Sequence, residues 1–380
     1  MRDRASEREK FSISITYDVI VTGDLEKAAR TAEQWTKLLP RDPRAFNALH
    51  FTHDLAGQFD EGLAAMREAV RLEPTGLMYL YLAETYTALG RFDEARATIQ
   101  QAEANHADPV LFRSLLYELA FLRNDSAGMA EQLTGPWMRC APGVTDEAQS
   151  STAAYYGHLS QARELEQRAI ASAKQRGAND VMASYLVNAA LVEALFGDFP
   201  EAQKAVKDAG RVTSWGLEGT AAIVWALSGD TAQAQKLADD LEKRFPEATY
   251  VRFGSLPAVR GLLAIHRGNA QEGIENLRAN PSPELVPQIV VVYVRGQAYL
   301  ATHRGAEAAA EFQEIIDHRG LVRSSPIGAL AHLGLGRAYA LQGDTAKART
   351  AYQDFLALWK DADPDIPVLQ QAKVEYAKLQ

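Results

Sequence analysis

The sequence has few of the features that hold secreted or membrane-spanning proteins together. Cys140 is the only cysteine among 380 residues, so no disulfide can form within the chain and nothing requires an oxidising compartment. The start, MRDRASEREK, is charged and leads into no apolar stretch of signal-peptide type. The longest apolar runs, such as Ile289 to Val294, are far too short to span a bilayer. These absences predict no membrane insertion and, by default, a cytoplasmic location; membrane anchoring through another part of a longer protein stays an open alternative.

Clustered positive charge is also missing. The chain carries 40 basic and 49 acidic residues, for a formal charge of -9, and it has no basic tract. A nucleic-acid backbone is bound by clustered Lys and Arg, so the sequence argues against a nucleic-acid partner. Apolar residues make up 47% of the chain, which is enough to form a packed core.

Motifs of catalysis or metal binding are absent or incomplete. No Gly-x-Ser-x-Gly, His-Glu-x-x-His or phosphate-loop pattern occurs. His50 and His53 have a spacing that suits a metal, but no third histidine lies nearby in sequence. The segment 361–365 begins like a calcium loop, yet Ile366 and Ala372 replace the required Gly and Glu. The sequence therefore predicts no catalytic residue, no cofactor and no metal site.

What the sequence does contain is a phrase that recurs ten times: an apolar stretch, a Gly-polar turn and an Ala-rich amphipathic stretch. Examples are TGDLEKAAR from Thr22, LGRFDEARA from Leu89 and QGDTAKART from Gln342. The gaps between successive turns are 34, 33, 34, 33, 40, 32, 39, 35 and 40 residues, and the first four match the tetratricopeptide period of about 34. The turn residues are Gly23, Gly57, Gly90, Asn124, Gly157, Gly197, Gly229, Gly268, His303 and Gly343.

Each part of the phrase has a physical role. The turn residue allows the left-handed conformation that ends the first helix of a hairpin, and an Asp after it caps the second helix. Ser6 and Glu9 predict a capping box at the first helix, and Asp365 predicts a cap for the last. Small residues follow six of the turns, where two helices must approach closely. These are Ala28, Ala95, Ala202, Ala234, Ala308 and Ala348.

Three segments resemble the tetratricopeptide pattern directly. They are Phe46-x-x-Leu49 through Pro74, Tyr79-x-x-Leu82-Ala83 through Ala102, and Leu335-Gly336 through Tyr352. Departures include Gly62, where Ala is usual. The resemblance implies an all-α fold: a right-handed α–α superhelix of about ten helical hairpins over residues 1–380, closed by a capping helix at about 366–379. In this family such a solenoid is a non-catalytic scaffold that binds a protein or peptide partner.

A narrower resemblance is carried by ALFGDFPEAQK, VRGQAYLA and residues 324–369. These segments resemble the repeat region at the C-terminus of acidobacterial-type serine/threonine protein kinases. The kinase motifs themselves do not occur in this chain. The resemblance implies the regulatory or sensory arm of a bacterial signalling kinase, and a fragment or shortened relative of a longer solenoid. The interaction arm of a transcription regulator and an enzyme with a site in the groove are the alternatives.

The first helix of each hairpin is expected to line the concave side, where a peptide would bind. The positions that alignment of the repeats places there are Tyr17, Arg44, Asn47, Phe51, Asp54, Glu84, Thr87 and Glu118. Further along, the groove turns apolar, which indicates either a second binding surface or, the favoured interpretation, tighter packing. Those positions are Val187, Leu191, Ala194, Ile223, Leu262, Ile265 and Leu300. Association between copies of the chain is left open.

Overall fold

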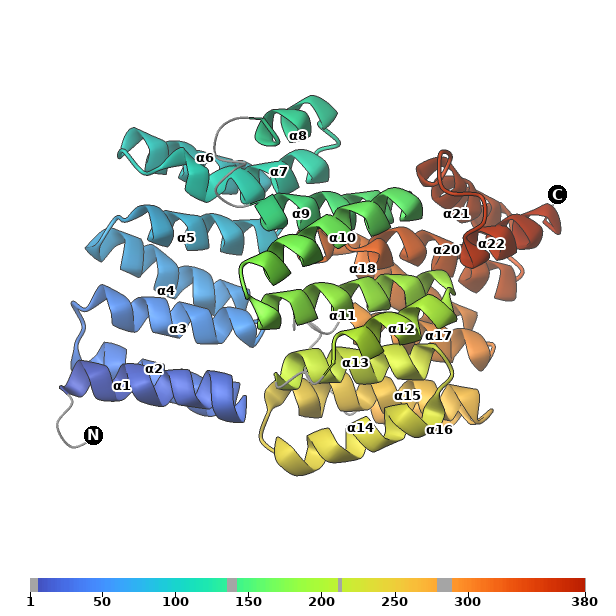
Figure 1. Ribbon diagram of the computed structural model, residues 1–380, viewed down its shortest axis with the longest axis horizontal. Coiled ribbons are helices and arrows are strands. Elements are labelled where there is room, and N and C mark those ends of the chain that lie inside the picture. The colour runs from blue at the N-terminus through green and yellow to red at the C-terminus, as the bar shows by residue number, and fades with distance from the viewer. Residues whose placement is uncertain (1–5, 135–141, 211–213, 279–288, 380) are drawn as a thin grey trace.

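The computed structural model describes residues 6–134, 142–210, 214–278 and 289–379, and within them all regular structure is helical (Figure 1). Cys140 lies outside these ranges. The helices form ten consecutive antiparallel pairs, which build the superhelical repeat fold that the sequence predicts. A short helix, α19 (Arg319–Val322), separates the ninth pair from the tenth, and α22 (Pro367–Ala377) follows the last.

The first five pairs occupy the first half of the chain. They are α1 (Glu7–Tyr17), continued by the π-helical turn η2 (Asp18–Thr22), with α2 (Leu25–Leu38); α3 (Pro43–Leu55) with α4 (Phe59–Leu72); α5 (Gly76–Ala88) with α6 (Phe92–Ala104); α7 (Arg113–Leu122), preceded by the 3₁₀ turn η3 (Pro109–Phe112), with α8 (Ser126–Gln132); and α9 (Pro142–Tyr155) with α10 (Leu159–Gln175).

The second five pairs continue the coil. They are α11 (Asn179–Phe196) with α12 (Phe199–Asp208); α13 (Trp215–Leu227) with α14 (Thr231–Arg244); α15 (Leu256–His266), preceded by the π-helical turn η5 (Val251–Ser255), with α16 (Ala270–Arg278); α17 (Ile289–Ala301) with α18 (Gly305–Asp317); and α20 (Pro326–Leu341) with α21 (Thr345–Leu358).

The turns between paired helices have the conformation that the repeated phrase predicts. All ten predicted turn residues have positive φ, including the two that are not glycine, Asn124 and His303, each at 56°. Where Asp follows the turn, its carboxylate accepts a hydrogen bond from the backbone N–H three residues on, as Asp230 does from Gln233. Asp365 does not act in this way: α22 begins at Pro367 and its N-cap is Ile366, so that prediction was wrong.

The small residues expected at close helix contacts are all fully buried. Ala28, Ala95, Ala202, Ala234, Ala308 and Ala348 each have 0% of their surface exposed. A larger side chain at these positions would force paired helices apart.

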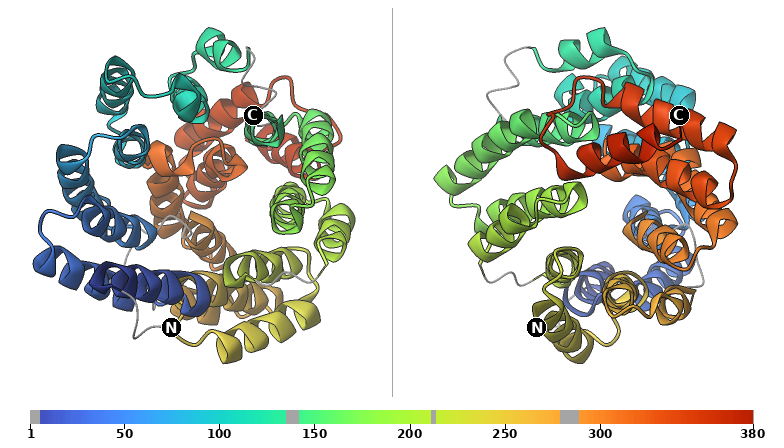
Figure 2. Two further views of the ribbon diagram at one scale, coloured as in Figure 1. Left: turned by 60° about the vertical axis from the view of Figure 1, so that its left-hand side comes forward. Right: turned by 90° about the vertical axis from the view of Figure 1, so that its right-hand side faces the viewer.

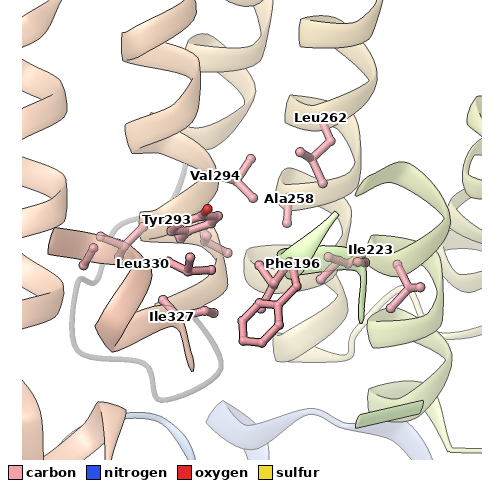
Figure 3. Close-up of a cluster of buried hydrophobic side chains, with 14 of the residues drawn as sticks. Phe196, Ile223, Ala258, Leu262, Tyr293, Val294, Ile327 and Leu330 are labelled. Carbon is pink, nitrogen blue, oxygen red and sulfur yellow. The ribbon is translucent and has the colours of Figure 1, made fainter. Parts of the chain in front are cut away.

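The inner face of the later repeats is filled by apolar side chains. Phe196, Ile223, Leu262, Val294 and Leu330 come from five different helices and meet in one buried cluster (Figure 3). Six of the seven residues of the predicted apolar groove belong to this cluster or pack against it, and the seventh, Val187, is fully buried. The favoured interpretation, tighter packing, is therefore confirmed.

Segments far apart in the sequence also meet, so the superhelix closes on itself (Figure 2). The first turn of the coil contacts the region before η5: the backbone N–H of Thr249 donates to the carbonyl of Gly23 at 2.9 Å, and the Tyr250 hydroxyl donates to the carbonyl of Leu55 at 2.7 Å. Near the end of the chain, the Trp359 indole donates to the carbonyl of Tyr155 at 2.9 Å.

A second closure involves residues 318–325, which contain α19 and connect α18 to α20. Arg319 donates to the carbonyl of Leu122 at 2.9 Å, and Ser324 bonds Ser151 at 3.0 Å. Gly320 lies so close to α5 that an added Cβ would overlap the carbonyl oxygen of Thr87. This segment therefore covers the inner side of α5 and α7.

Candidate functional site

The first helices of the first two pairs, α1 and α3, border an open cavity of about 400 Å³, which we call the amino-terminal groove. Its α1 residues recur every three or four positions, so they share one face of the helix. Trp35 of α2 contributes to the groove, and its ring stacks on Phe11 with centroids 5.7 Å apart. The lining residues are Arg8, Glu9, Ser12, Ile15, Thr16, Val19, Ile20, Trp35, Arg44, Asn47, Ala48 and Phe51.

Local sequence fixes the two borders of the groove. Ser6 and Glu9 form the predicted capping box at the start of α1. Asp42 caps α3, and its carboxylate also pairs with Arg8 at 2.8 Å, which holds the start of α1 against the start of α3. At the other end, α1 widens into the π-helical turn η2, and Ile20 on that turn remains 64% exposed. Such turns often occur where a helix redirects side chains at a functional site.

The chemistry of the groove suits a peptide. The Trp35 Nε1 and the Asn47 Oδ1 are buried and have no hydrogen-bond partner among the described residues. Beside them, Ile20 and Phe51 expose apolar surface, and Phe51 is 47% exposed. An indole N–H and a side-chain amide can bond the carbonyl and N–H of a peptide group, while the apolar residues contact its side chains.

The sequence prediction places three of its eight residues in this groove. Arg44, Asn47 and Phe51 lie one turn apart along α3 and line it together. Tyr17 does not join them: it is 53% exposed and lines a separate hollow with residues of α2, including Lys27.

The other four predicted residues contact the chain itself. Asp54 accepts a hydrogen bond from the Thr85 hydroxyl at 3.0 Å. Thr87 is fully buried and donates to its own helix. Glu118 pairs with Arg323 of the 318–325 segment at 2.6 Å. Burial raises the pKa of the nearby Glu84 carboxyl, and the charge of Arg323 opposes that rise.

Behind the 318–325 segment lies a second cavity, of about 320 Å³, which we call the interior pocket. Helices α7, α9, α10 and α11 and residues 321–326 form its wall. Four glutamates line it: Glu118, Glu147, Glu166 and Glu193. Sequence reasoning missed this pocket, because its walls come from segments as far apart in the chain as Tyr117 and Pro326. One feature of the sequence could have indicated the pocket: the two least regular copies of the repeat, near Asn124 and Gly157, contain glutamates.

In the described structure, two of the four glutamates in the interior pocket are paired with an arginine and two are not. Arg163 bonds both carboxylate oxygens of Glu193, at 2.7 and 2.8 Å. Among the described residues, Glu147 and Glu166 form no ion pair. Burial raises the pKa of Glu147, and the charge of Glu118 adds to the effect. Burial also raises the pKa of Glu166 to about 7; a hydrogen bond from Ser150 opposes this rise and the charge of Glu147 adds to it.

The histidines and carboxylates considered as metal ligands have other contacts. His50 is buried with its Nδ1 3.3 Å from Asp54, and His53 bonds Gln58 at 2.6 Å. Asp363 accepts a hydrogen bond from the backbone N–H of Ser160 at 2.6 Å, which joins distant parts of the coil. In the described part of the chain, no three His, Cys, Asp or Glu residues are grouped as metal ligands. None of the described helices is both long and apolar enough to cross a membrane.

Comparison with known families identifies the repeat. Family models described as tetratricopeptide repeat match residues 55–117 and 293–365. These segments coincide with α4 to the middle of α7 and with α17 to the end of α21. These two segments are therefore tetratricopeptide repeats, and the predicted resemblance to that repeat is confirmed for them. No curated protein matches the chain in sequence.

Several solved structures are similar at low identity. The Cut9–Hcn1 hetero-tetramer of the APC/C is 14% identical with a TM-score of 0.48; the match covers 100% of this chain and 64% of that one. The tetratricopeptide domain of P58(IPK) is 12% identical, with 99% and 98% coverage and a TM-score of 0.28. Yeast Tom70 is 12% identical, with 98% and 96% coverage and a TM-score of 0.31.

Proposed function

We propose that this chain is a non-catalytic scaffold that binds an extended segment of a partner protein in the amino-terminal groove. Tetratricopeptide repeats generally serve protein–protein interaction, and they bind on the inner side of the superhelix. The observation that carries the proposal is the pair of buried, unpartnered groups, Trp35 Nε1 and Asn47 Oδ1, beside the exposed apolar surface of Ile20 and Phe51. Buried polar groups normally have partners, so these two favour a ligand with peptide groups.

The rest of the inner side supports this choice of groove. Residues 318–325 cover α5 and α7, and apolar packing fills the inner side of α11 to α20. Along α1 and α3, the amino-terminal groove combines open space with unpartnered polar groups. We further propose that residues 1–380 form one solenoid, since hydrogen bonds join Thr249 to the first pair and Tyr250 to the second.

A pull-down from the source organism, followed by titration of each identified partner with purified protein, tests the proposal. The double variant Asn47→Ala, Phe51→Ala should lose binding by tenfold or more. Glu84→Ala is the contrast, because Glu84 lies under the 318–325 segment and should leave affinity unchanged. A partner that binds the double variant and the wild type equally would refute the groove as the site.

The narrower resemblance supports a specific context for this scaffold. Residues 324–369 resemble the repeat region of acidobacterial-type serine/threonine kinases, so we propose that the solenoid is the regulatory or sensory arm of such a kinase. Sequencing the gene upstream of Met1 tests this directly. A kinase domain in the same reading frame supports it, and a winged-helix DNA-binding domain there would replace it with a transcription regulator.

A further inference from the structure

The interior pocket exists because the superhelix closes. Leu321 and Val322 of the 318–325 segment form one wall, while Tyr117 and Phe121 of α7 and side chains of α9 to α11 form the others. Its volume of about 320 Å³ lies at the lower end of the range for small-molecule sites. About half of the lining side chains are apolar or aromatic, and the others are serines, glutamates, two arginines and an asparagine.

Two of the four glutamates in this pocket are neutralised from within the protein. Glu118 pairs with Arg323 at 2.6 Å, and Glu193 is held by both nitrogens of Arg163. These pairs account for both arginines that line the pocket. Glu147 and Glu166 therefore have no cation of their own in the described structure.

Glu166 is the more informative of these two residues. Its side chain lines the pocket and the residue is only 8% exposed, yet its Oε1 has no hydrogen-bond partner among the described residues. The Ser150 hydroxyl donates to the carbonyl of Ala162 at 3.0 Å. A buried carboxylate that has one unpartnered oxygen and no cation is costly, and a ligand that brings positive charge and N–H donors would remove that cost.

The pocket lining defines what such a ligand looks like. An ammonium group offers three N–H donors to Glu147 and Glu166. The aliphatic stem behind it would contact Leu321, Val322 and the other apolar side chains that line the pocket.

We propose that the interior pocket binds a primary alkylammonium group through Glu147 and Glu166. The same chemistry comes from two sources, a free aliphatic diamine or a lysine side chain of a partner protein. The site is separate from the amino-terminal groove, so either proposal stands if the other fails.

Isothermal titration of the full chain at pH 8, above the pKa of about 7 of Glu166, tests this binding. The probes are 1,5-diaminopentane and 1-pentanol, which have the same chain length but differ in charge. The diamine should bind saturably and the alcohol should not. Glu166→Gln and Glu147→Gln should each weaken diamine binding by tenfold or more. Glu164→Gln is the matched control, because Glu164 lies on the same helix with a side chain that is 74% exposed.

Two further arms separate the sources and guard against misfolding. Nα-acetyl-lysine methylamide tests the lysine source: binding by it as well as by the diamine favours a partner's side chain, and binding by the diamine alone favours a free amine. Thermal melting of each variant verifies folding. The diamine should raise the melting temperature of the wild type, since its pocket exists only in the closed superhelix. Absence of saturable binding to the wild type, or binding of the diamine by both Gln variants as tightly as by the wild type, overturns the proposal.

Discussion

Replacing Glu166 by glutamine should change how the stability of this protein depends on pH. Burial raises the pKa of Glu166 in the folded protein to about 7, from the usual value near 4.5. Between these values the folded protein holds a proton that the unfolded chain releases. The contribution of Glu166 to the free energy of unfolding is therefore most favourable below about pH 4.5. It is lost as the pH rises through 7.

The size of the effect follows from proton linkage. Each pKa unit is worth about 1.4 kcal/mol, so Glu166 lowers the free energy of unfolding by about 3 kcal/mol between pH 4.5 and 7. Glutamine fills similar space and does not titrate. Relative to the wild type, Glu166→Gln should thus gain about 3 kcal/mol in stability as the pH rises from 4.5 to 8. Glu193 and Arg163 line the same pocket and are unchanged in both proteins, so the difference reports Glu166 together with its coupling to the charge of Glu147.

Urea unfolding of the wild type, Glu166→Gln and Glu164→Gln at pH 5 and pH 8 measures this difference. Most of the expected gain in the stability of Glu166→Gln relative to the wild type falls between these two pH values. Glu164 is exposed on the same helix, so its variant should follow the wild type at both pH values. A stability difference between Glu166→Gln and the wild type that stays constant from pH 5 to pH 8 would refute the reasoning.

Three other substitutions test the fold and the groove. Gly320→Ala places a methyl group against the Thr87 carbonyl and should cost about 1–3 kcal/mol by urea unfolding, whereas Gly216→Ala, with no atom nearer than 3.8 Å, should cost less than about 1 kcal/mol; equal costs would contradict the tight closure. Asp230→Ala removes a helix cap and should cost about 1 kcal/mol, and an unchanged unfolding midpoint would argue against that cap. Phe51→Ala should alter stability by less than about 1 kcal/mol while reducing partner affinity, and a large stability loss would make Phe51 a core residue instead.

The features that could be predicted from the sequence are those that each repeat specifies within itself. A residue in the left-handed conformation, a capping Asp and a small residue at the helix contact all act within about ten residues. Asn124 and His303 adopt positive φ even though they are not glycine, because the flanking helices fix where the turn must be. Asp365 failed as a cap because Pro367 starts the last helix one residue later than the cap position requires.

The features that could not be predicted depend on the pitch of the superhelix. Whether Glu118 lies in an open groove or against Arg323 is decided by how much each repeat rotates on the last, summed over about six repeats. A small change in that rotation moves the 318–325 segment by many ångströms. Alignment of single repeats contains no information about this accumulated rotation. It therefore placed Glu84, Thr87 and Glu118 in the same open groove as Asn47.

Closure also assigns different roles to positions that are equivalent in the repeat. In α3, the inner face remains open and carries an unpartnered Asn47 and an exposed Phe51. In α5, the corresponding face lies against Gly320, and its Thr87 is fully buried. Part of the binding face common to tetratricopeptide repeats is thus used to join one turn of the coil to the next. A partner that bound at α5 would have to displace residues 318–325 and would open the interior pocket, whereas a partner at α3 would leave both closures intact.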